Sequence, residues 1–544
     1  MALSQLRIDR VAGRFLPHDA TARPLNLGLA WSGLAGVTLI AILVRLVTLH
    51  AQSAWLDEGY TLAVARHTLP DLIGFTVQYD AHPPLYYALL HLWLQGTGFD
   101  LTQARLLSLL CGVGSVLALY AVATVLFDRA TGLGAAALLA LSPLASWYSD
   151  ETRMYAMTGF LSLLALFFLV CATRRDRQWF WLAYAVCAAL AAYADYSAVY
   201  IVIGAAAYAL LAVLAGDASP RHWAVAHGVL VALLLPALLM LHEQAQSLSG
   251  ISWIPAPSPA VVGATLLDLV SFHTIVPPLA AALGLALIAL GVLALRRDWR
   301  TPRLRRSYIF VACTILAPLC IPLLLSLGQH VFLTRTVMMA LDGAIILAVR
   351  GLLDLARRWR WWPLALLPIL LLNGMSLATA ATTTINEDWR GAANIVCSAV
   401  TPRDVIIFDP GFLRLPFDVY GANCGAGVSK RGYPYDESLL VAHPLLLRTP
   451  NELTSATRGA PSVWLVTRDS NPGTIAPLAD VVGAGLTARF GQPRPLHLHD
   501  ITIYLFGADQ ARVRQRASGA VQPAAPTDTG SNVVAAAARH DPLP

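Results

Sequence analysis

Two short clusters of acidic residues carry the chemistry that this sequence suggests. Asp57 and Glu58 stand together where the first long hydrophobic run has ended, and Asp150 and Glu151 follow a later run. Acids at a membrane boundary are costly unless they face water or a partner, so they indicate function by default. A carboxylate there can take the proton of an incoming hydroxyl group and make its oxygen nucleophilic. The alternative is that Asp57 and Glu58 are only the solvated end of a helix, and the second cluster argues against it.

Basic side chains that suit a phosphate group lie in the same parts of the chain. His82 stands before two prolines, Arg153 follows the second acidic cluster, and Arg335 is an isolated basic residue in a short outer segment. An isolated arginine at such a place needs an anionic partner, either an acid or a phosphate. Acids and basic groups that meet at the level of the lipid suit an anionic lipid substrate together with a polar one.

The composition predicts that membrane helices position these residues. Of the 544 residues, 57% are hydrophobic and 13% are charged, whereas soluble domains are about 25% charged. The net charge of +6 does not indicate nucleic-acid binding, because the basic residues fall in short clusters between apolar runs, as in cytoplasmic loops. We therefore expect membrane lipids as partners and no nucleic acid. The first apolar run is long and lacks a convincing cleavage site, so we expect it to be retained.

Apolar runs alternate with basic clusters in a way that predicts the topology. Residues 1–25 are expected to be cytoplasmic, and residues 26–380 to form a transmembrane module of about eleven helices. Its first outer loop is residues 51–103. Two crossings, 104–126 and 132–148, separate the acidic clusters, so both clusters should face the same compartment. If they do, they can build one site.

The polarity of the chain changes after the last predicted helix. We expect residues 381–508 to form a small α/β domain outside the membrane, and residues 509–544, rich in Ala, Pro and Thr, to be disordered. Cys397 and Cys424 could pair if this part is exported, although spacing alone does not decide such a pairing. Strands are expected in this domain at 404–408, 462–467 and 501–506, and a helix is expected at 389–400.

Four motifs, in this order and spacing, make the sequence resemble a known family. They are W-L-D-E-G at 55–59, H-P-P-L-Y-Y at 82–87, Y-S-D-E-T-R-M-Y at 148–155 and F-L-T-R at 332–335. The sequence resembles the GT-C membrane glycosyltransferases, in the branch that holds protein O-mannosyltransferases and lipid A aminoarabinose transferases. The stretch D-W-R-x-A-A that begins at Asp388 is also similar to this family. Its non-catalytic interpretation is a helix start that docks the outer domain.

The resemblance implies a GT-C fold and a reaction. The donor is a sugar linked to a polyprenyl phosphate, and an acceptor attacks it on the outer face of the membrane. Asp57 would be the general base, with Glu58 as its neighbour or hydrogen-bond partner. The leaving phosphate is already a weak base, so it needs charge stabilisation and no general acid. Direct displacement predicts inversion at the anomeric carbon.

The resemblance also implies substrate-binding residues. His82 and Arg335 match basic positions near the donor phosphate, and Asp150 and Glu151 match an acidic position that orients the site or holds a metal ion. Arg153 and Tyr155 belong to the same motif and are expected to bind substrate. In the aminoarabinose enzymes, an acid implicated in metal binding stands directly before the basic residue of the proline motif. This chain has Ala81 at that position, and its nearest acid, Asp80, stands one residue earlier. We expect no required cofactor and leave a divalent metal open. Asp195 and Asp268 are expected to be loop or cap residues.

The sequence leaves the sugar open, and it leaves the acceptor open among a glycan, a lipid and a protein. We expect a bacterial inner (cytoplasmic) membrane protein whose active site and C-terminal domain face the periplasm or exterior. One alternative is a transporter, such as a flippase for lipid-linked glycans, which would share the many helices and a basic cavity. A transporter would not need two acidic clusters at one mouth and would often show repeated halves. A second alternative is an assembly protein whose outer domain binds envelope polymer, which would leave Asp57 and Glu58 unexplained.

Overall fold

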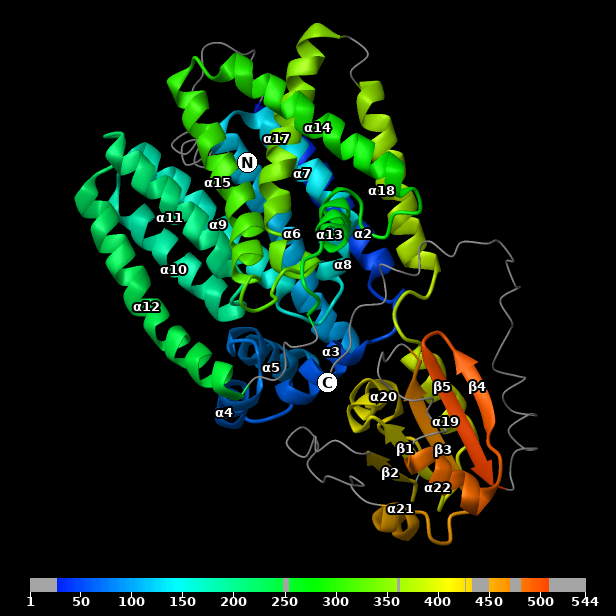
Figure 1. The fold of residues 1–544 in the computed structure, drawn as a ribbon. Helices are drawn as coiled ribbons and strands as arrows, with labels where there is room; N and C mark the ends of the chain where they lie inside the picture. Colours follow the sequence, from blue (N-terminus) through cyan, green and yellow to red (C-terminus); the bar gives the residue numbers. More distant parts are fainter. Residues whose placement is uncertain are drawn as a thin grey trace, which may run out of the picture. The chain divides into compact units, whose positions relative to one another are not determined.

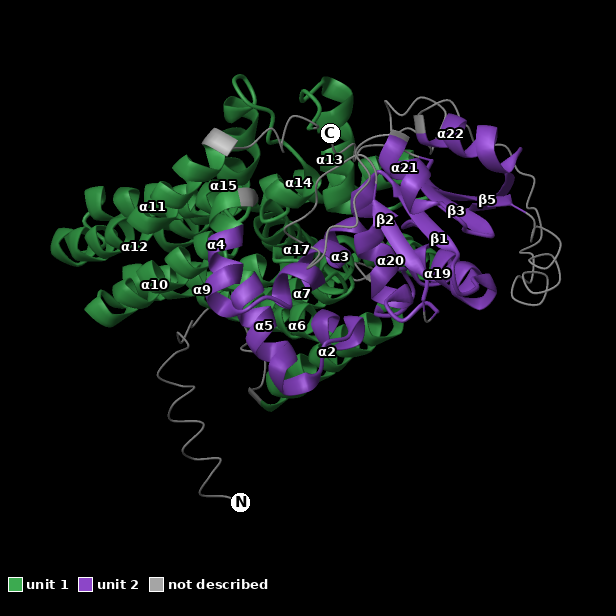
Figure 2. Cartoon of the chain, turned by 90° about the horizontal axis from the view of Figure 1, so that it is seen from below, with its two compact units in different colours: residues 1–48, 76–86, 106–379 green, residues 49–75, 87–105, 380–544 purple. Residues whose placement is uncertain are grey.

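The computed structural model describes residues 27–247, 254–359, 363–425, 427–432, 450–469 and 481–507. The predicted cytoplasmic segment 1–25 and the predicted disordered tail 509–544 lie outside the described residues. The chain divides into two compact units (Figure 2). Unit 1 contains residues 1–48, 76–86 and 106–379, and unit 2 contains residues 49–75, 87–105 and 380–544.

Unit 1 is helical. In its periphery α9, α10 and α12 pack side by side, and α14 packs on α17 (Figure 1). Its helices are α2 (Leu27–Thr48), α6 (Leu101–Leu126, shared with unit 2), α7 (Arg129–Ala140), α8 (Pro143–Ser149), α9 (Tyr155–Arg175), α10 (Gln178–Ala194), α11 (Ala198–Leu214), α12 (Pro220–Ser247), α13 (Pro259–Val270), α14 (Pro277–Asp298), α15 (Pro302–Leu325), α16 (Thr334–Val337), α17 (Ala340–Arg358) and α18 (Pro363–Thr382).

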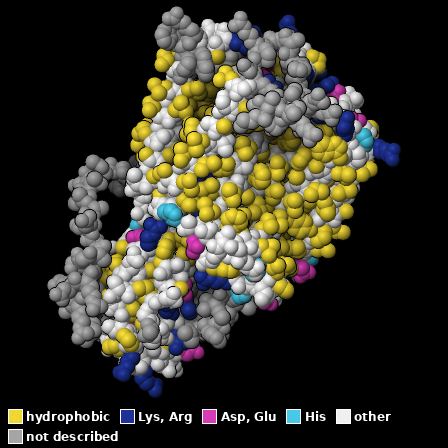
Figure 3. Space-filling model, turned by 180° about the vertical axis from the view of Figure 1, so that it is seen from behind, with side chains coloured by type: hydrophobic (Ala, Val, Ile, Leu, Met, Phe, Trp, Pro, Cys, Tyr) yellow, Lys and Arg dark blue, Asp and Glu magenta, His cyan; other side chains and the backbone are white. Residues whose placement is uncertain are grey.

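Six of the described helices are long and apolar enough to cross a membrane, and a bent pair would make seven. They are α2, α6, α9, α12, α14 and α15. Hydrophobic side chains spread over a wide face of the helical unit, as lipid contact requires (Figure 3). Each predicted crossing coincides with a helix or with the bent pair, but α10, α11, α17 and α18 are shorter or less apolar than a full span. The chain is thus a multi-pass membrane protein, and the number eleven stays a prediction.

The bent pair corrects one predicted crossing. The segment 132–148 was expected as a single helix, whereas α7 and α8 are bent by 63°. Asp128 caps α7 by accepting a hydrogen bond from the Thr131 amide, and Ser142 caps α8 in the same way. Pro143 stands in the first turn of α8, where proline favours a new helix start over a continued one. After the break, α8 ends at Ser149, directly before Asp150.

Unit 2 begins with the first outer loop. This loop folds into three helices, α3 (Leu56–Ala65), α4 (Leu69–Tyr79) and α5 (Leu85–Thr97), of which parts of α4 and α5 belong to unit 1. Residues 66–68 separate α3 from α4, and residues 80–84 separate α4 from α5.

The rest of unit 2 contains a domain built on a five-stranded sheet. It is residues 380–507, and it is called the outer domain after the prediction that it lies outside the membrane. Its strand order is β2-β1-β3-β5-β4, in which β2, β1 and β3 are parallel and β5 and β4 are antiparallel. The three predicted strands and the predicted helix are confirmed as β1, β3, β5 and α19. The elements are α19 (Trp389–Ala399), β1 (Val405–Asp409), η1 (Gly411–Leu413), α20 (Arg414–Gly421), β2 (Ser429–Gly432), α21 (Pro450–Ala456), β3 (Ser462–Arg468), α22 (Val481–Phe490), β4 (Arg494–Leu498) and β5 (Ile501–Gly507).

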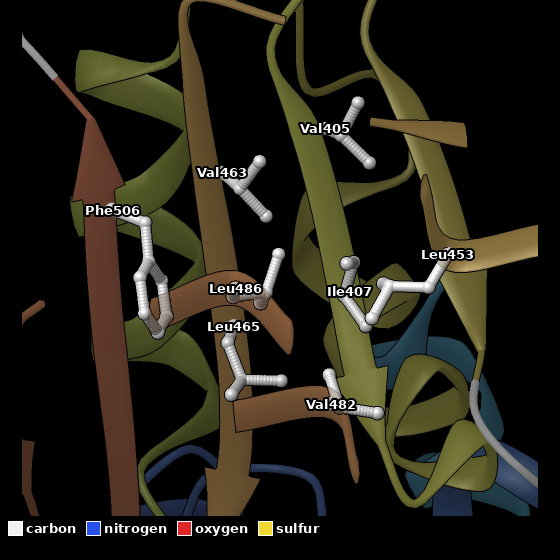
Figure 4. Packing of buried hydrophobic residues seen from close by; sticks show 8 residues of the cluster. All are labelled: Val405, Ile407, Leu453, Val463, Leu465, Val482, Leu486 and Phe506. Atoms are coloured by element: carbon white, nitrogen blue, oxygen red, sulfur yellow. The ribbon is translucent and has the colours of Figure 1, made fainter. Parts of the chain in front are cut away.

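One face of this sheet carries the domain's core. Ile407, Leu465 and Phe506 point from three strands toward Leu453 of α21 and Leu486 of α22 (Figure 4). These side chains are at most 4% exposed. The alternation along each strand puts the next residue on the opposite face, which is covered by α19 and α20.

The outer domain holds a disulfide. Cys397 at the end of α19 is bonded to Cys424 after α20, with 4.8 Å between their Cα atoms. The pairing that the sequence left open is therefore present, and it ties two helices on the same face of the sheet.

Replacing Cys397 by Ala is expected to lower the free energy of unfolding of the outer domain by about 3 kcal/mol. The bond closes a loop of 27 residues, and in the chain-entropy model such a loop is worth roughly this amount. Denaturant unfolding followed by hydrogen exchange of the backbone amides of β1, β3 and β5 measures the change. Cys320→Ala, which removes an exposed free thiol, is the control. Equal stability of the two variants would contradict a structural disulfide.

Candidate active site

The W-L-D-E-G motif forms the start of α3. The helix begins at Leu56 after the extended residue Trp55, so Asp57 and Glu58 occupy its first turn. Carboxylates are favourable there because unpaired backbone N–H groups point at them. The two acids nevertheless differ: Glu58 is completely buried, whereas Asp57 is partly exposed.

Glu58 forms a bidentate ion pair with Arg105. The Arg105 Nε donates to one carboxylate oxygen at 2.8 Å and Nη2 donates to the other at 2.6 Å. Nη1 of the same guanidinium donates to the carbonyl oxygens of Leu49 and Gln52. Both side chains are at most 3% exposed. Glu58 therefore fixes the turn between α2 and α3, which fits a supporting role better than that of the proton acceptor.

Gly59, the last residue of the motif, lies directly against the outer domain. A Cβ atom at this position would approach the backbone nitrogen of Pro416 to 2.6 Å and the carbonyl carbon of Leu415 to 2.7 Å. Both belong to α20, which packs on α3. A side chain would push the two helices apart, so the glycine is required by this close approach.

The D-W-R stretch docks the beginning of the outer domain, as its non-catalytic interpretation predicted. Asp388 caps α19 by accepting a hydrogen bond from the Gly391 amide at 2.8 Å, and Trp389 is fully buried. Arg390 reaches back to the connection between α2 and α3, where its Nη2 donates to the carbonyl oxygen of His50 at 3.1 Å.

An ion pair of the outer domain lies within electrostatic range of Asp57. Arg468 Nη2 is 2.7 Å from Glu387 Oε1, and both side chains are largely buried. Burial raises the pKa of the Glu387 carboxyl, Arg468 opposes this, and the negative charges of Asp500 and Asp57 add to the rise. Asp57 thus has a second carboxylate and an arginine in its surroundings within unit 2.

In unit 1, Asp150 ends α8 and is held from the first membrane helix. The hydroxyl group of Thr48, at the end of α2, donates to the Asp150 carboxylate. Arg45, one turn earlier and completely buried, is a charge partner of the same acid. Gly112 makes room for this arrangement, because a Cβ there would lie 3.1 Å from Arg45 Nε.

Two of the predicted basic residues of unit 1 lie beside Tyr155, the first residue of α9. Arg153 and Arg335 place their guanidinium carbons 5.9 and 6.0 Å from the centre of this ring. The neighbouring Tyr148, whose ring centre is 5.0 Å from that of Tyr155, has Glu151, Arg335 and Asp268 among its charged neighbours. Cations over an aromatic face are stabilised by its quadrupole, so the Tyr155 ring favours both arginines at this place.

His82 is paired with Asp80. The imidazole Nδ1 lies 3.1 Å from Asp80 Oδ1, which also accepts the His82 amide at 3.0 Å. The carbonyl oxygen of His82 accepts a bond from Gln244. Asp80 thus orients His82.

The predicted site residues fall into both units. Asp57 and Glu58 belong to unit 2, whereas the predicted substrate-binding residues belong to unit 1. Within unit 1 the structure brings Glu151, Arg335 and Tyr155 together. Each unit is described by itself, so the meeting of the two acidic clusters stays a prediction. No group of three or more His, Cys, Asp or Glu side chains that could hold a metal ion occurs in the described ranges, and the question of a metal at Asp150 and Glu151 stays open.

Sequence reasoning missed three residues of this arrangement. Arg105 stands near the start of an apolar helix, and this position was the only signal of a buried partner. Thr48 gave no signal, because a threonine at a helix end is common. Asp268 was expected to be a loop or cap residue, whereas it lies within α13 and accepts a hydrogen bond from Thr334 at 2.7 Å. The expectation for Asp195 is confirmed, since it ends α10 and accepts the Ser197 amide.

Comparisons with known proteins bear on the fold of this chain. Residues 81–240 match the family model described as dolichyl-phosphate-mannose-protein mannosyltransferase. ArnT from Cupriavidus metallidurans in the apo state has a similar structure, with a TM-score of 0.61 and 13% identity over 88% of this chain and 98% of that chain. The same protein bound to undecaprenyl phosphate gives a TM-score of 0.57 at 13% identity and the same coverage.

The oligosaccharyltransferase of Archaeoglobus fulgidus in its apo form is more distant, with a TM-score of 0.50 and 12% identity over 74% of this chain and 64% of that chain. No sequence among the curated proteins matches. The fold of this chain is that of the GT-C membrane glycosyltransferases. The resemblance to the protein mannosyltransferase and ArnT type that the motifs indicated is confirmed.

Proposed function

We propose that this protein is a glycosyltransferase that moves a sugar from a polyprenyl-phosphate donor to an acceptor on the outer face of the cytoplasmic membrane. The observation that carries the proposal is the difference between the two acids of the W-L-D-E-G motif. Glu58 is neutralised by Arg105, whereas Asp57 is partly exposed at the start of α3. The ArnT structure with undecaprenyl phosphate supports a prenyl-phosphate donor.

The reaction is a single displacement. The acceptor oxygen forms a bond to the anomeric carbon while the bond from that carbon to the donor phosphate breaks. Asp57 takes the proton of the acceptor, and the polyprenyl phosphate leaves with the bonding electron pair. Attack from the side opposite the phosphate inverts the anomeric carbon.

The basic residues of unit 1 suit the leaving phosphate. Arg335 and Arg153 lie around Tyr155, and His82 is oriented by Asp80. Guanidinium groups bind phosphate through charge-assisted hydrogen bonds, and stabilising the charge that develops on the leaving oxygen lowers the barrier. Asp150, held by Thr48 and beside Arg45, would orient the sugar. The proposal requires that these residues and Asp57 face one cavity, on the periplasmic or exterior side.

Replacing Arg335 by Ala is expected to weaken donor binding roughly 10-fold or more, because a charge-assisted hydrogen bond is worth about 1.5–3 kcal/mol. Turnover should fall with it. Binding of a radiolabelled polyprenyl-phosphate sugar to the purified protein measures the change. Arg297→Ala, which removes a half-exposed arginine paired with Asp354, is the control. Unchanged donor affinity in Arg335→Ala would exclude Arg335 from the phosphate site.

A comparison of envelope lipids and glycans from cells with and without the protein tests the proposed function. Mass spectrometry should find one acceptor that is heavier by one sugar unit only when the protein is present. A donor lipid that changes sides of the membrane, with no change in any acceptor, would support a transporter instead.

A further inference from the structure

The segment that carries Asp57 is clamped by the outer domain at several consecutive points. The segment 50–59 connects α2 to α3, and all the contacts below lie within unit 2. This region therefore belongs structurally with the outer domain, although more than 300 residues separate the two along the chain.

Gln52 is the first point of the clamp. Its amide nitrogen donates to the carbonyl oxygens of Ala380 and Thr383 at 2.6 and 2.8 Å. Its amide oxygen accepts the backbone N–H groups of Ile385 and Asn386 at 2.9 and 3.2 Å. One buried side chain thus satisfies four backbone groups of the linker that enters the outer domain.

Arg390 and Tyr420 form the second point. The Arg390 amide donates to the Ser53 hydroxyl at 3.1 Å, and its guanidinium donates to the His50 carbonyl oxygen. The guanidinium carbon also lies 5.6 Å from the ring centre of Tyr420. The hydroxyl group of Tyr420 accepts the Ala54 amide at 2.7 Å, two residues before α3 begins.

The third point is Gly59, on which α20 packs without an intervening side chain. Asp57 therefore lies between two fixed contacts, Ala54 on one side along the chain and Gly59 on the other. A general base acts only within hydrogen-bond reach of the proton that it takes, and a misplacement of about 1 Å can cost roughly 10²-fold in rate.

We infer that the outer domain positions the catalytic base: Gln52, Arg390 and Tyr420 are positioning residues that set the rate of transfer through the placement of Asp57. The catalytic part of this inference rests on the proposed function. The domain is thus a working part of the active site, in addition to any contact that it makes with the acceptor.

Arg390→Ala tests the inference, with Arg489→Ala as a matched control. Arg489 is also an arginine of the outer domain that donates to a backbone carbonyl, and it also lies over an aromatic ring, Phe490, at 5.2 Å. Its contacts stay within the outer domain, so its loss should leave transfer unchanged. The readouts are kcat, the KM for the donor, and hydrogen exchange of the backbone amides of residues 49–60.

Arg390→Ala is expected to lower kcat about 10-fold or more, to leave the KM for the donor within about twofold, and to accelerate exchange in residues 49–60. Arg390→Lys should recover part of the rate by restoring the donor to the His50 carbonyl. A kcat equal to that of Arg489→Ala, or a parallel loss in kcat and donor affinity, would overturn the positioning role. If the wild-type protein transfers no sugar, the proposed function fails. In that case unchanged exchange in Arg390→Ala would also refute the clamp, and faster exchange would uphold it.

Discussion

Replacing Asp57 by Asn lowers the rate of sugar transfer by roughly 10²-fold or more, the lower end of what a general base contributes. The substitution keeps the size of the side chain and removes its ability to take a proton. Folding should change little, because Asp57 is partly exposed and stands at the surface of the first turn of α3. Donor binding should also stay close to that of the wild type, since the basic residues expected at the phosphate are elsewhere.

Single-turnover transfer from a polyprenyl-phosphate sugar measures this effect, and donor binding is measured alongside it. Asp71→Asn is the control, because Asp71 is an exposed acid in the first turn of α4, the next helix of the same loop. Near-normal transfer by Asp57→Asn, with transfer lost in a Glu58→Gln variant that folds normally, would assign the base to Glu58. Normal transfer in both would mean that this loop is not catalytic.

Replacing Arg105 by Met lowers the free energy of unfolding by about 3–5 kcal/mol, the amount typical of breaking a buried ion pair from one side. The substitution leaves the Glu58 carboxylate buried without its bidentate partner. It also removes the Arg105 donor of the Leu49 carbonyl oxygen and one of the two donors of the Gln52 carbonyl oxygen, which keeps Arg390. The double variant Glu58→Gln with Arg105→Met removes the uncompensated charge. It should therefore be less destabilised than the sum of the two single variants.

Denaturant unfolding in detergent measures these differences. Arg297→Met is the control: its partner is Asp354 at 2.7 Å, but the arginine is 49% exposed. Exposed ion pairs contribute only about 0–1 kcal/mol, so this variant should unfold almost as the wild type does. If Arg105→Met were no less stable than Arg297→Met, the Glu58–Arg105 pair would not fix the turn between α2 and α3.

The sequence predicted the features that follow from hydrophobic periodicity and from local motifs. The helix at 389–400, the strands around Val405 and Val463, and the docking role of the Asp388 stretch could all be read from neighbouring residues. The acids of the two clusters were singled out because charge at the end of an apolar run is costly, and their role stays a prediction.

What the sequence could not predict depends on contacts between distant segments. The pairing of Glu58 with Arg105 joins residues 47 positions apart, and the bonds of Gln52 join positions more than 300 apart. Nothing local marks such partners. The break between α7 and α8 was missed for another reason: both halves are apolar, and the local signal, Ser142 followed by Pro143, was outweighed by continuous hydrophobicity.

Release of free polyprenyl phosphate tests the central claim most directly. The purified protein would be given a synthetic polyprenyl-phosphate sugar together with an extract of the envelope as acceptor, and the lipid products would be measured by mass spectrometry. We expect the wild-type protein to release polyprenyl phosphate in an amount equal to the sugar gained by the acceptor, and Asp57→Asn to release at most about 1% as much in the same time. Equal release by both proteins, or release by neither, would contradict the account.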